Sequence, residues 1–105
     1  MRKRAPVVWT RPALDSLLDI VRQIQVDEPV AAHRFASTLK ASVARLKHFP
    51  ESGRIVPEFQ DSGVREIVVG EYRVVYRVSK APVSVQILTI RHGVRLMESS
   101  PESGS

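Results

Sequence analysis

Residues 63–78 have the sequence GVREIVVGEYRVVYRV, and this stretch predicts a β-hairpin. Valine, isoleucine and tyrosine, which favour strands, lie on both sides of Gly70-Glu71. Glycine at the first position of a two-residue loop suits a type II′ turn, whose backbone matches the twist of a hairpin. The turn therefore sets a register in which Val69 lies opposite Tyr72.

The predicted register sorts the side chains of the sheet onto two faces, because successive residues of a strand point to opposite sides. The face expected to receive helices carries Ile67, Val69, Tyr72, Val74, Tyr76, Val78, Val83, Val85 and Ile87. The opposite face carries Glu66, Arg73, Arg77, Ser84, Gln86 and His92. We therefore expect Arg73 and Arg77 to point outward from the face that the helices leave open, and Arg65 to lie beside Tyr76 on the helix side.

Two amphipathic helices are predicted before the hairpin. The first runs from about Pro12 to Val26 behind an N-cap at Thr10, and its apolar residues are Leu14, Leu17, Leu18, Val21 and Ile24. The second follows the acidic cap and proline of residues 27–29, and its apolar stripe is Ala32, Phe35, Leu39, Val43 and Leu46. Because their connection is short, the helices should form an antiparallel hairpin against a common sheet.

The remaining strands complete an expected α+β fold. A short extended run covers Ala5–Trp9, and later strands are predicted at Arg54–Val56, Val64–Val69, Tyr72–Val78 and Val83–Ile90, with a candidate edge strand at Val94–Met97. The loop of residues 79–82 should place Arg77 opposite Ser84 and Arg73 opposite Leu88. We expect an N-terminal strand, an antiparallel helical hairpin and a three- to four-stranded antiparallel sheet.

Composition indicates one soluble domain with a modest core. The chain has 105 residues, of which 43% are hydrophobic and 26% charged. It has no apolar run of membrane-spanning length and no cysteine, which fits a cytoplasmic protein that neither spans nor binds a membrane. The net charge of +5 favours an acidic partner. Twelve of the sixteen basic residues are arginine, which suits phosphate and carboxylate recognition, although an arginine-rich genome gives the same bias.

Glu66, Arg73 and His92 form a candidate acid–base set on the open face. An arginine there would stabilise negative charge while a carboxylate or an imidazole moves a proton. The alternative is a surface ion pair between Glu66 and an arginine, worth under about 1 kcal/mol. The histidines have no metal-ligand spacing and the glycines are single, so we expect no metal site and no cofactor.

Several motifs taken together resemble the RelE/ParE superfamily of bacterial toxin–antitoxin toxins, and most closely its ParE branch. They are WTRPALDSLL at 9–18, FPESGRIVPE at 49–58, VRE at 64–66, GEYRVVYRV at 70–78 and IRHGVR at 90–95. The likeness runs from Val8 to about Leu96. It implies a single toxin domain over residues 1–98, and the polar residues 99–105 are expected to form a flexible tail.

The resemblance implies one of two activities. RelE-like members are ribonucleases that cut messenger RNA at the ribosome, and the matching residues here would be Arg73, His92 and an acidic residue, Glu66 or Glu58. ParE-like members inhibit DNA gyrase and lack the nuclease residues. No tyrosine follows His92 in this chain, which favours the ParE branch. The surface then expected to bind gyrase consists of Arg73, Arg77, Arg91, His92 and Arg95.

The resemblance also implies a cognate antitoxin that binds the toxin directly. Such antitoxins commonly have a flexible, acidic tail, which the positive charge of this chain would attract. The tail could lie as a helix in an apolar groove or extend an edge of the sheet. Operator DNA is expected to be bound only through the antitoxin. A third interpretation is a degenerate member that keeps the fold and the antitoxin but has lost toxicity.

Overall fold

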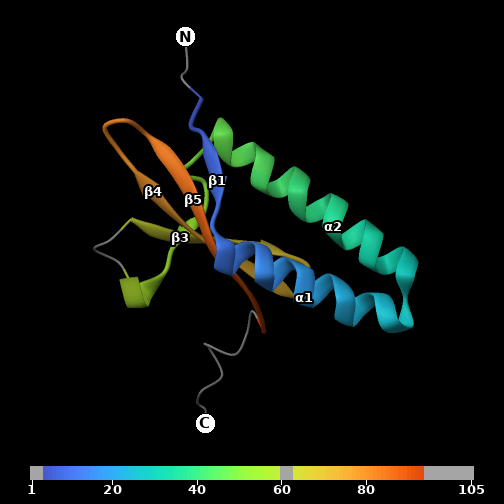
Figure 1. Ribbon diagram of the computed structural model, residues 1–105. Helices are drawn as coiled ribbons and strands as arrows, with labels where there is room; N and C mark the ends of the chain where they lie inside the picture. The colour runs from blue at the N-terminus through green and yellow to red at the C-terminus, as the bar shows by residue number, and fades with distance from the viewer. Residues whose placement is uncertain (1–3, 60–62, 94–105) are drawn as a thin grey trace.

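The structure is a computed structural model that describes residues 4–59 and 63–93, apart from the side chain of Glu58. Its elements are β1 (Val7–Trp9), α1 (Arg11–Asp27), α2 (Pro29–Ala44), η1 (Arg45–Lys47), β2 (Arg54–Ile55), η2 (Pro57–Phe59), β3 (Val64–Val69), β4 (Tyr72–Ser79) and β5 (Ser84–His92). The strands form one sheet in the order β1-β5-β4-β3-β2. Figure 1 shows the helical hairpin on one side of this sheet. The expected α+β fold is confirmed, while the predicted run Val94–Met97 lies outside the described residues.

The edge strand β1 leads directly into α1. β1 pairs in parallel with β5, and Val7 lies opposite Val85. Thr10, between β1 and α1, is the predicted N-cap. Its hydroxyl donates a hydrogen bond to the Ile87 carbonyl at 2.7 Å and accepts one from the Ala13 amide at 3.3 Å. One side chain therefore caps α1 and fastens it to β5.

The helices bury different shares of their predicted stripes. In α2 the prediction is confirmed, because Ala32, Leu39, Val43 and, in η1, Leu46 are buried. In α1 the buried residues are Ala13 and Ile20, with Leu17 and Ile24 packed partly against the core. Leu14 and Leu18, which were predicted to face the core, are 43% and 50% exposed. The side of α1 that faces the core therefore differs from the predicted one: it includes Leu17 and Ile24 but not Leu14 and Leu18.

The β3–β4 hairpin has the predicted register. Val69 pairs with Tyr72 and Glu66 with Val75. Gly70 has a φ of 60°, which the first position of a type II′ turn requires. The turn residues therefore determined this pairing locally.

The register predicted between β4 and β5 is wrong. Arg77 pairs with Gln86 instead of Ser84, and Arg73 pairs with Arg91 instead of Leu88. A β-bulge interrupts this ladder next to Val75, where one extra residue of β5 is inserted. Because a bulge reverses the alternation of all later side chains, the end of β5 has its two faces exchanged relative to the prediction.

Each face of the sheet has its own buried cluster. The face under the helices holds the main core, which includes Leu39, Tyr76 and Ile87. The other side, here called the helix-free face, carries Val64, Glu66, Val68, Arg73, Val75 and Arg77. Its smaller cluster joins Val56, just before η2, to Val64, Val75 and the bulge residue Leu88. The helix-free face is therefore partly buried, and not the open surface that the sequence predicted.

Candidate functional site

The centre of the helix-free face is a buried ion pair. Arg73 Nη1 lies 2.8 Å from Glu66 Oε1, and the two side chains are 3% and 1% exposed. Arg54 on β2 donates from Nε to Glu66 Oε2 at 2.7 Å, while its own side chain remains 59% exposed. The prediction that Arg73 and Glu66 face solvent is wrong, since both side chains are buried although they lie on the helix-free face.

This arrangement keeps the Glu66 carboxylate from general base work. Each of its oxygens accepts a hydrogen bond from a guanidinium, and the side chain is 1% exposed, so a substrate proton cannot come within the hydrogen-bond reach that a general base needs. The pair is a structural element instead. Within the described part of the chain, Arg73 Nε is buried and has no hydrogen-bond acceptor, so Glu66 alone compensates this guanidinium.

His92 lies on the other face of the sheet. It pairs with Tyr72, and the two rings meet edge to face with centroids 4.9 Å apart. Its Nε2 atom is 3.2 Å from Glu71 Oε1, and Tyr72 in turn contacts Phe35 of α2. The predicted set of Glu66, Arg73 and His92 is therefore not assembled, because the bulge in β5 turns His92 toward the helix side.

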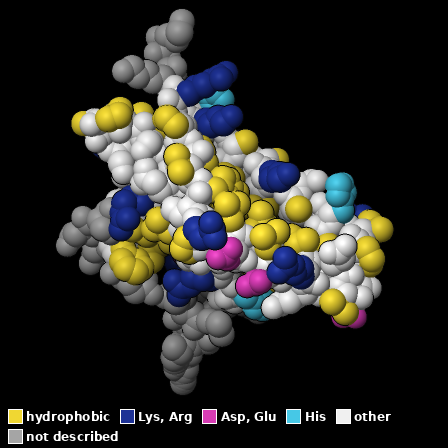
Figure 2. Space-filling model, viewed as in Figure 1, with side chains coloured by type: hydrophobic (Ala, Val, Ile, Leu, Met, Phe, Trp, Pro, Cys, Tyr) yellow, Lys and Arg dark blue, Asp and Glu magenta, His cyan; other side chains and the backbone are white. Residues whose placement is uncertain are grey.

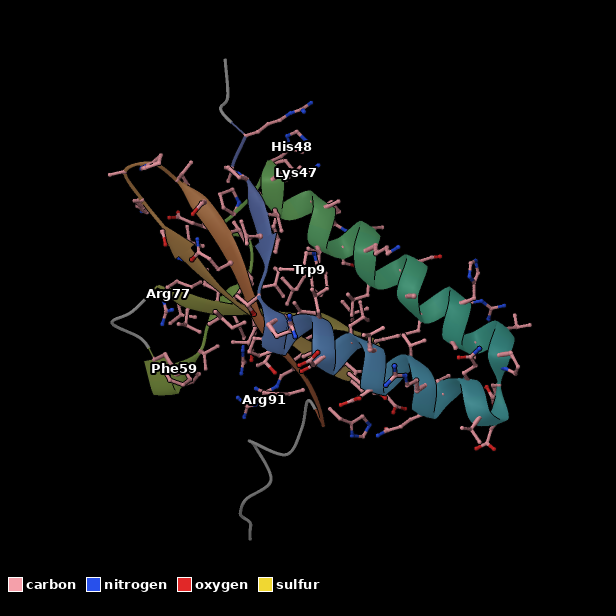
Figure 3. The ribbon with its side chains drawn as sticks, in the orientation of Figure 1. Trp9, Lys47, His48, Phe59, Arg77 and Arg91 are labelled. Atoms are coloured by element: carbon pink, nitrogen blue, oxygen red, sulfur yellow. The ribbon has the colours of Figure 1, made fainter. Side chains whose placement is uncertain are left out.

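Arg91 takes the place that was predicted for His92. It lies directly opposite Arg73 on the helix-free face, and it is exposed. Arg77 is also exposed on this face, about 13 Å further along β4 at the usual rise of a strand. Figure 3 shows Arg77 toward the side of Phe59 and Arg91 near the end of β5. Arg95 and the side chain of Glu58 lie outside what the structure describes.

A hydrogen-bonded loop supports β2 beside this face. The Gly53 amide donates to the Tyr76 hydroxyl at 2.9 Å, and Arg65 Nη1 donates to the Gly53 carbonyl at 2.7 Å. Arg65 does lie opposite Tyr76, as predicted. A side chain at Gly53 would meet the Glu66 carbonyl and the Tyr76 hydroxyl at 2.6 Å, so only glycine fits this contact. The loop places Arg54, a partner of Glu66 that the sequence analysis did not single out.

Burial raises the pKa of the Tyr76 phenol, because the charged phenolate would lose its hydration. The hydrogen bond from Gly53 and the positive charge of Arg65 oppose this rise. Tyr76 is therefore held as a neutral phenol that accepts a backbone hydrogen bond, which is a structural role.

A separate apolar surface lies on α1. Leu14 and Leu18, one helical turn apart, are each about half exposed, at 43% and 50%. Val8 is also 51% exposed, but it pairs with Gln86, which pairs with Arg77, so it lies on the helix-free face. Figure 2 shows hydrophobic side chains gathered where β1 meets the helices, with lysine, arginine and acidic side chains around them. Exposed apolar side chains ringed by charge are typical of protein-binding surfaces.

Two further findings, on metal clusters and on membrane-spanning helices, concern the described residues alone. Among them, no group of three or more His, Asp or Glu side chains is placed to hold a metal ion. Neither helix in the described ranges combines the length and the hydrophobicity that a bilayer span requires.

Fold and surfaces together define a small basic α+β protein with a helical hairpin on one side of its sheet and exposed arginines on the other. Residues 7–97 match the family described as ParE toxin of type II toxin-antitoxin system, parDE. The chain belongs to this family of toxins. The sequence resemblance to the ParE branch is thereby confirmed.

Individual relatives agree with the family. Y4kP of Sinorhizobium fredii, which is named as a candidate toxin, is 36% identical over 93 residues, covering 87% of this chain and 88% of the relative. A chromosomal ParDE system of P. aeruginosa shares the fold with a TM-score of 0.71 and 24% identity, covering 86% of this chain and 97% of that one. The RelBE2 toxin–antitoxin complex of Mycobacterium tuberculosis follows with a TM-score of 0.61 and 21% identity, covering 85% and 98%.

Proposed function

We propose that this type II toxin acts by binding and inhibiting DNA gyrase, and that a cognate antitoxin neutralises it by direct contact. The observation that carries the proposal is the separation of the candidate nuclease groups. Glu66 and Arg73 neutralise each other inside the protein, while His92 lies on the opposite face. A surface of this kind supports binding better than proton transfer.

The target surface consists of the exposed arginines of the helix-free face. Arg77 and Arg91 present guanidinium groups from two neighbouring strands, and Arg95 follows a few residues later in the sequence. Arg73 acts behind them: its buried pair with Glu66 holds β3 and β4 in place under the exposed arginines. His92, which the sequence analysis included in this surface, lies on the other face of the sheet beside Tyr72 and is not part of the proposed surface. Exposed arginines suit an acidic or phosphate-bearing partner.

A supercoiling assay with purified gyrase tests the target. We expect the wild-type protein at micromolar concentration to inhibit supercoiling, and the double variant Arg77→Glu/Arg91→Glu to lose most of this inhibition. Arg22→Glu/Arg34→Glu changes the net charge equally on the helices, and it should inhibit like the wild type. Unchanged gyrase activity with the wild-type protein would remove gyrase as the target.

The proposed antitoxin contact uses the apolar surface of Leu14 and Leu18 on α1. An amphipathic segment could cover these side chains while its acidic residues meet the surrounding lysines and arginines. Operator DNA would then be bound through the antitoxin. Co-expression of the adjacent gene tests this: Leu14→Lys/Leu18→Lys should lose neutralisation, whereas the exposed but remote Val26→Lys should keep it. Equal neutralisation of both variants would exclude this surface.

The runner-up is a ribosome-dependent ribonuclease, which one observation favours. His92 is 62% exposed and close to the Glu71 carboxylate, so it is accessible to a substrate and has a group that can orient it. Primer extension on messenger RNA in a translating extract should then show cuts that disappear with His92→Ala. A protein that inhibits neither gyrase nor translation, and leaves growth unchanged when induced alone, would be a degenerate member.

A further inference from the structure

We propose that one end of the molecule binds a single strand of DNA, by stacking a base on an exposed aromatic ring and pairing phosphates with the basic side chains around it. This basic end consists of Arg4, Lys47, His48 and Phe49, all exposed, where the chain before β1 meets η1 and the turn after it. Figure 3 shows Lys47 and His48 there, away from the labelled arginines. The inference goes beyond the proposed function, since this end is separate from the arginine surface assigned to gyrase.

The fold brings these residues together although they are far apart in the sequence. The Ala5 amide donates to the Lys47 carbonyl at 2.8 Å, and Ala5 is 1% exposed. This buried contact places Arg4, the residue before it, next to η1. Figure 2 shows lysine or arginine side chains on both sides of a histidine at this end of the molecule. The basic side chains therefore form one surface.

The charge of this surface is not compensated within the described part of the chain. Neither Arg4 nor Lys47 has an ion pair with a described carboxylate. The nearby Glu51 instead pairs with Lys80 at 2.9 Å. Residues 2–3 are also basic, so the sequence adds further positive charge next to Arg4. A concentration of positive charge of this kind attracts a phosphate backbone.

The exposed ring of Phe49 favours a nucleic acid over other acidic partners. The side chain is 53% exposed, and the centroid of its ring lies 6.3 Å from that of His48. Its backbone is fixed, because the Phe49 amide donates to the Arg45 carbonyl and the Ser52 amide donates to the Phe49 carbonyl, both at 3.1 Å. A base stacks on such a ring while its phosphates meet the cations. The exposed apolar area is that of one ring, which one base covers.

An unpaired DNA strand fits this surface better than a duplex or an RNA. The bases of a duplex are stacked on one another, so they cannot cover an aromatic side chain. Proteins recognise RNA through its 2′-hydroxyl, and none of the four side chains of the basic end is a carboxylate or an amide that would accept the hydrogen of this group. We therefore expect DNA to bind at least as tightly as RNA.

Fluorescence anisotropy with the full-length protein and a labelled oligothymidine of about twelve nucleotides tests the inference. We expect saturable binding that weakens with salt, with a slope of about −2 for the logarithm of the binding constant against that of the salt concentration, which corresponds to about three neutralised phosphates. An oligouridine, a duplex and a polyglutamate of similar length are the comparisons. Tighter binding of the oligouridine or the duplex, equal competition by the polyglutamate, or no saturable binding at about 50 mM salt would overturn the inference.

Variants of Phe49 test the stacking. Phe49→Ala should weaken the oligothymidine about tenfold, the effect of losing one stacked base. Phe49→Tyr keeps an aromatic ring and should bind within about twofold of the wild type. Circular dichroism checks that both variants are folded. Equal binding by Phe49→Ala and the wild type would show that no base stacks there, which overturns the inference.

Charge variants separate the basic end from the rest of the surface. Lys47→Glu should weaken binding about tenfold and flatten the salt dependence, because it removes a phosphate contact and adds a repelling charge. Arg34→Glu, an equal charge change near the start of α2, should stay within about twofold. Equal weakening by both would mean that net charge alone attracts the strand. Gyrase is absent from this measurement, so the two proposals fail separately: Lys47→Glu should inhibit gyrase like the wild type, and Arg77→Glu/Arg91→Glu should still bind the oligothymidine.

Discussion

The two faces of the sheet are stabilised by different interactions. Under the helices, the core is apolar, and the hydroxyl of its fully buried tyrosine, Tyr76, accepts a hydrogen bond from the Gly53 amide. On the helix-free face, a charged pair, Glu66 and Arg73, lies beside a small valine cluster. Hydrophobic burial depends on volume and tolerates similar shapes, whereas a buried ion pair depends on both partners being present. The helix-free face, which carries the proposed target surface, should therefore lose more stability on substitution than the face under the helices.

Removing one partner of the buried pair should have the largest effect. Glu66→Gln keeps the volume but leaves the Arg73 guanidinium buried and uncompensated, so we expect the free energy of unfolding to fall by about 3–5 kcal/mol. Urea unfolding followed by circular dichroism measures it. The double variant Glu66→Leu/Arg73→Met should recover most of this loss, because no buried charge remains. A loss below about 1 kcal/mol in Glu66→Gln would mean that the pair is not buried in solution.

Removing the Tyr76 hydroxyl should have the next largest effect. Tyr76→Phe leaves the buried Gly53 amide without an acceptor, which should destabilise the protein by about 1–3 kcal/mol in the same urea measurement. The apolar packing of the ring is unchanged, so the loss reports the hydrogen bond. A neutral result would show that water reaches this amide.

The same variant tests the pKa of Tyr76. Because burial raises the pKa of this phenol in the folded state, the folded protein holds its proton at a pH where the unfolded chain, near its ordinary value of about 10, releases it. The contribution to stability is therefore complete below pH about 10 and is lost as the pH rises further. Unfolding curves from pH 9 to 11 should show a steeper loss for the wild type than for Tyr76→Phe. Parallel curves would contradict the raised pKa.

A volume-conserving change in the main core should be mild. Leu39 is completely buried under the helices, and we expect Leu39→Met to lower the free energy of unfolding by about 1 kcal/mol. Thermal unfolding with gyrase inhibition as a second readout would check it. A loss as large as that of Glu66→Gln would remove the distinction between the two faces.

The smallest effect should come from the end of β5. His92→Ala loses an exposed contact with Glu71 and an edge contact with Tyr72, together under about 1 kcal/mol. On the proposed function it should also leave gyrase inhibition largely intact. Loss of toxicity in a fully folded His92→Ala protein would instead favour the ribonuclease.

Local signals predicted much of the fold. The cap at Thr10, the stripe of α2 and the turn at Gly70-Glu71 each depend on a few neighbouring residues, and each is confirmed. The β4–β5 register failed for two reasons: Ser79 pairs with Ser84, so the loop is residues 80–83 instead of 79–82 and the pairing is shifted by two residues, and the bulge in β5, which has no clear local signature, adds one more. The candidate site failed with it, since the position of His92 depends on that extra residue.

The sequence by itself determined the order of the elements, the pairing of β3 with β4 and the family, because these follow from turn chemistry, periodicity and motifs within short windows. The tertiary structure alone decided that Glu66 and Arg73 are buried, that Arg91 replaces His92 on the helix-free face, and that Ala5 meets Lys47. The physical reason is distance along the chain. Burial and register depend on segments far apart in the sequence, such as β2 against β3 and the bulge of β5 against β4, and no local window contains both partners.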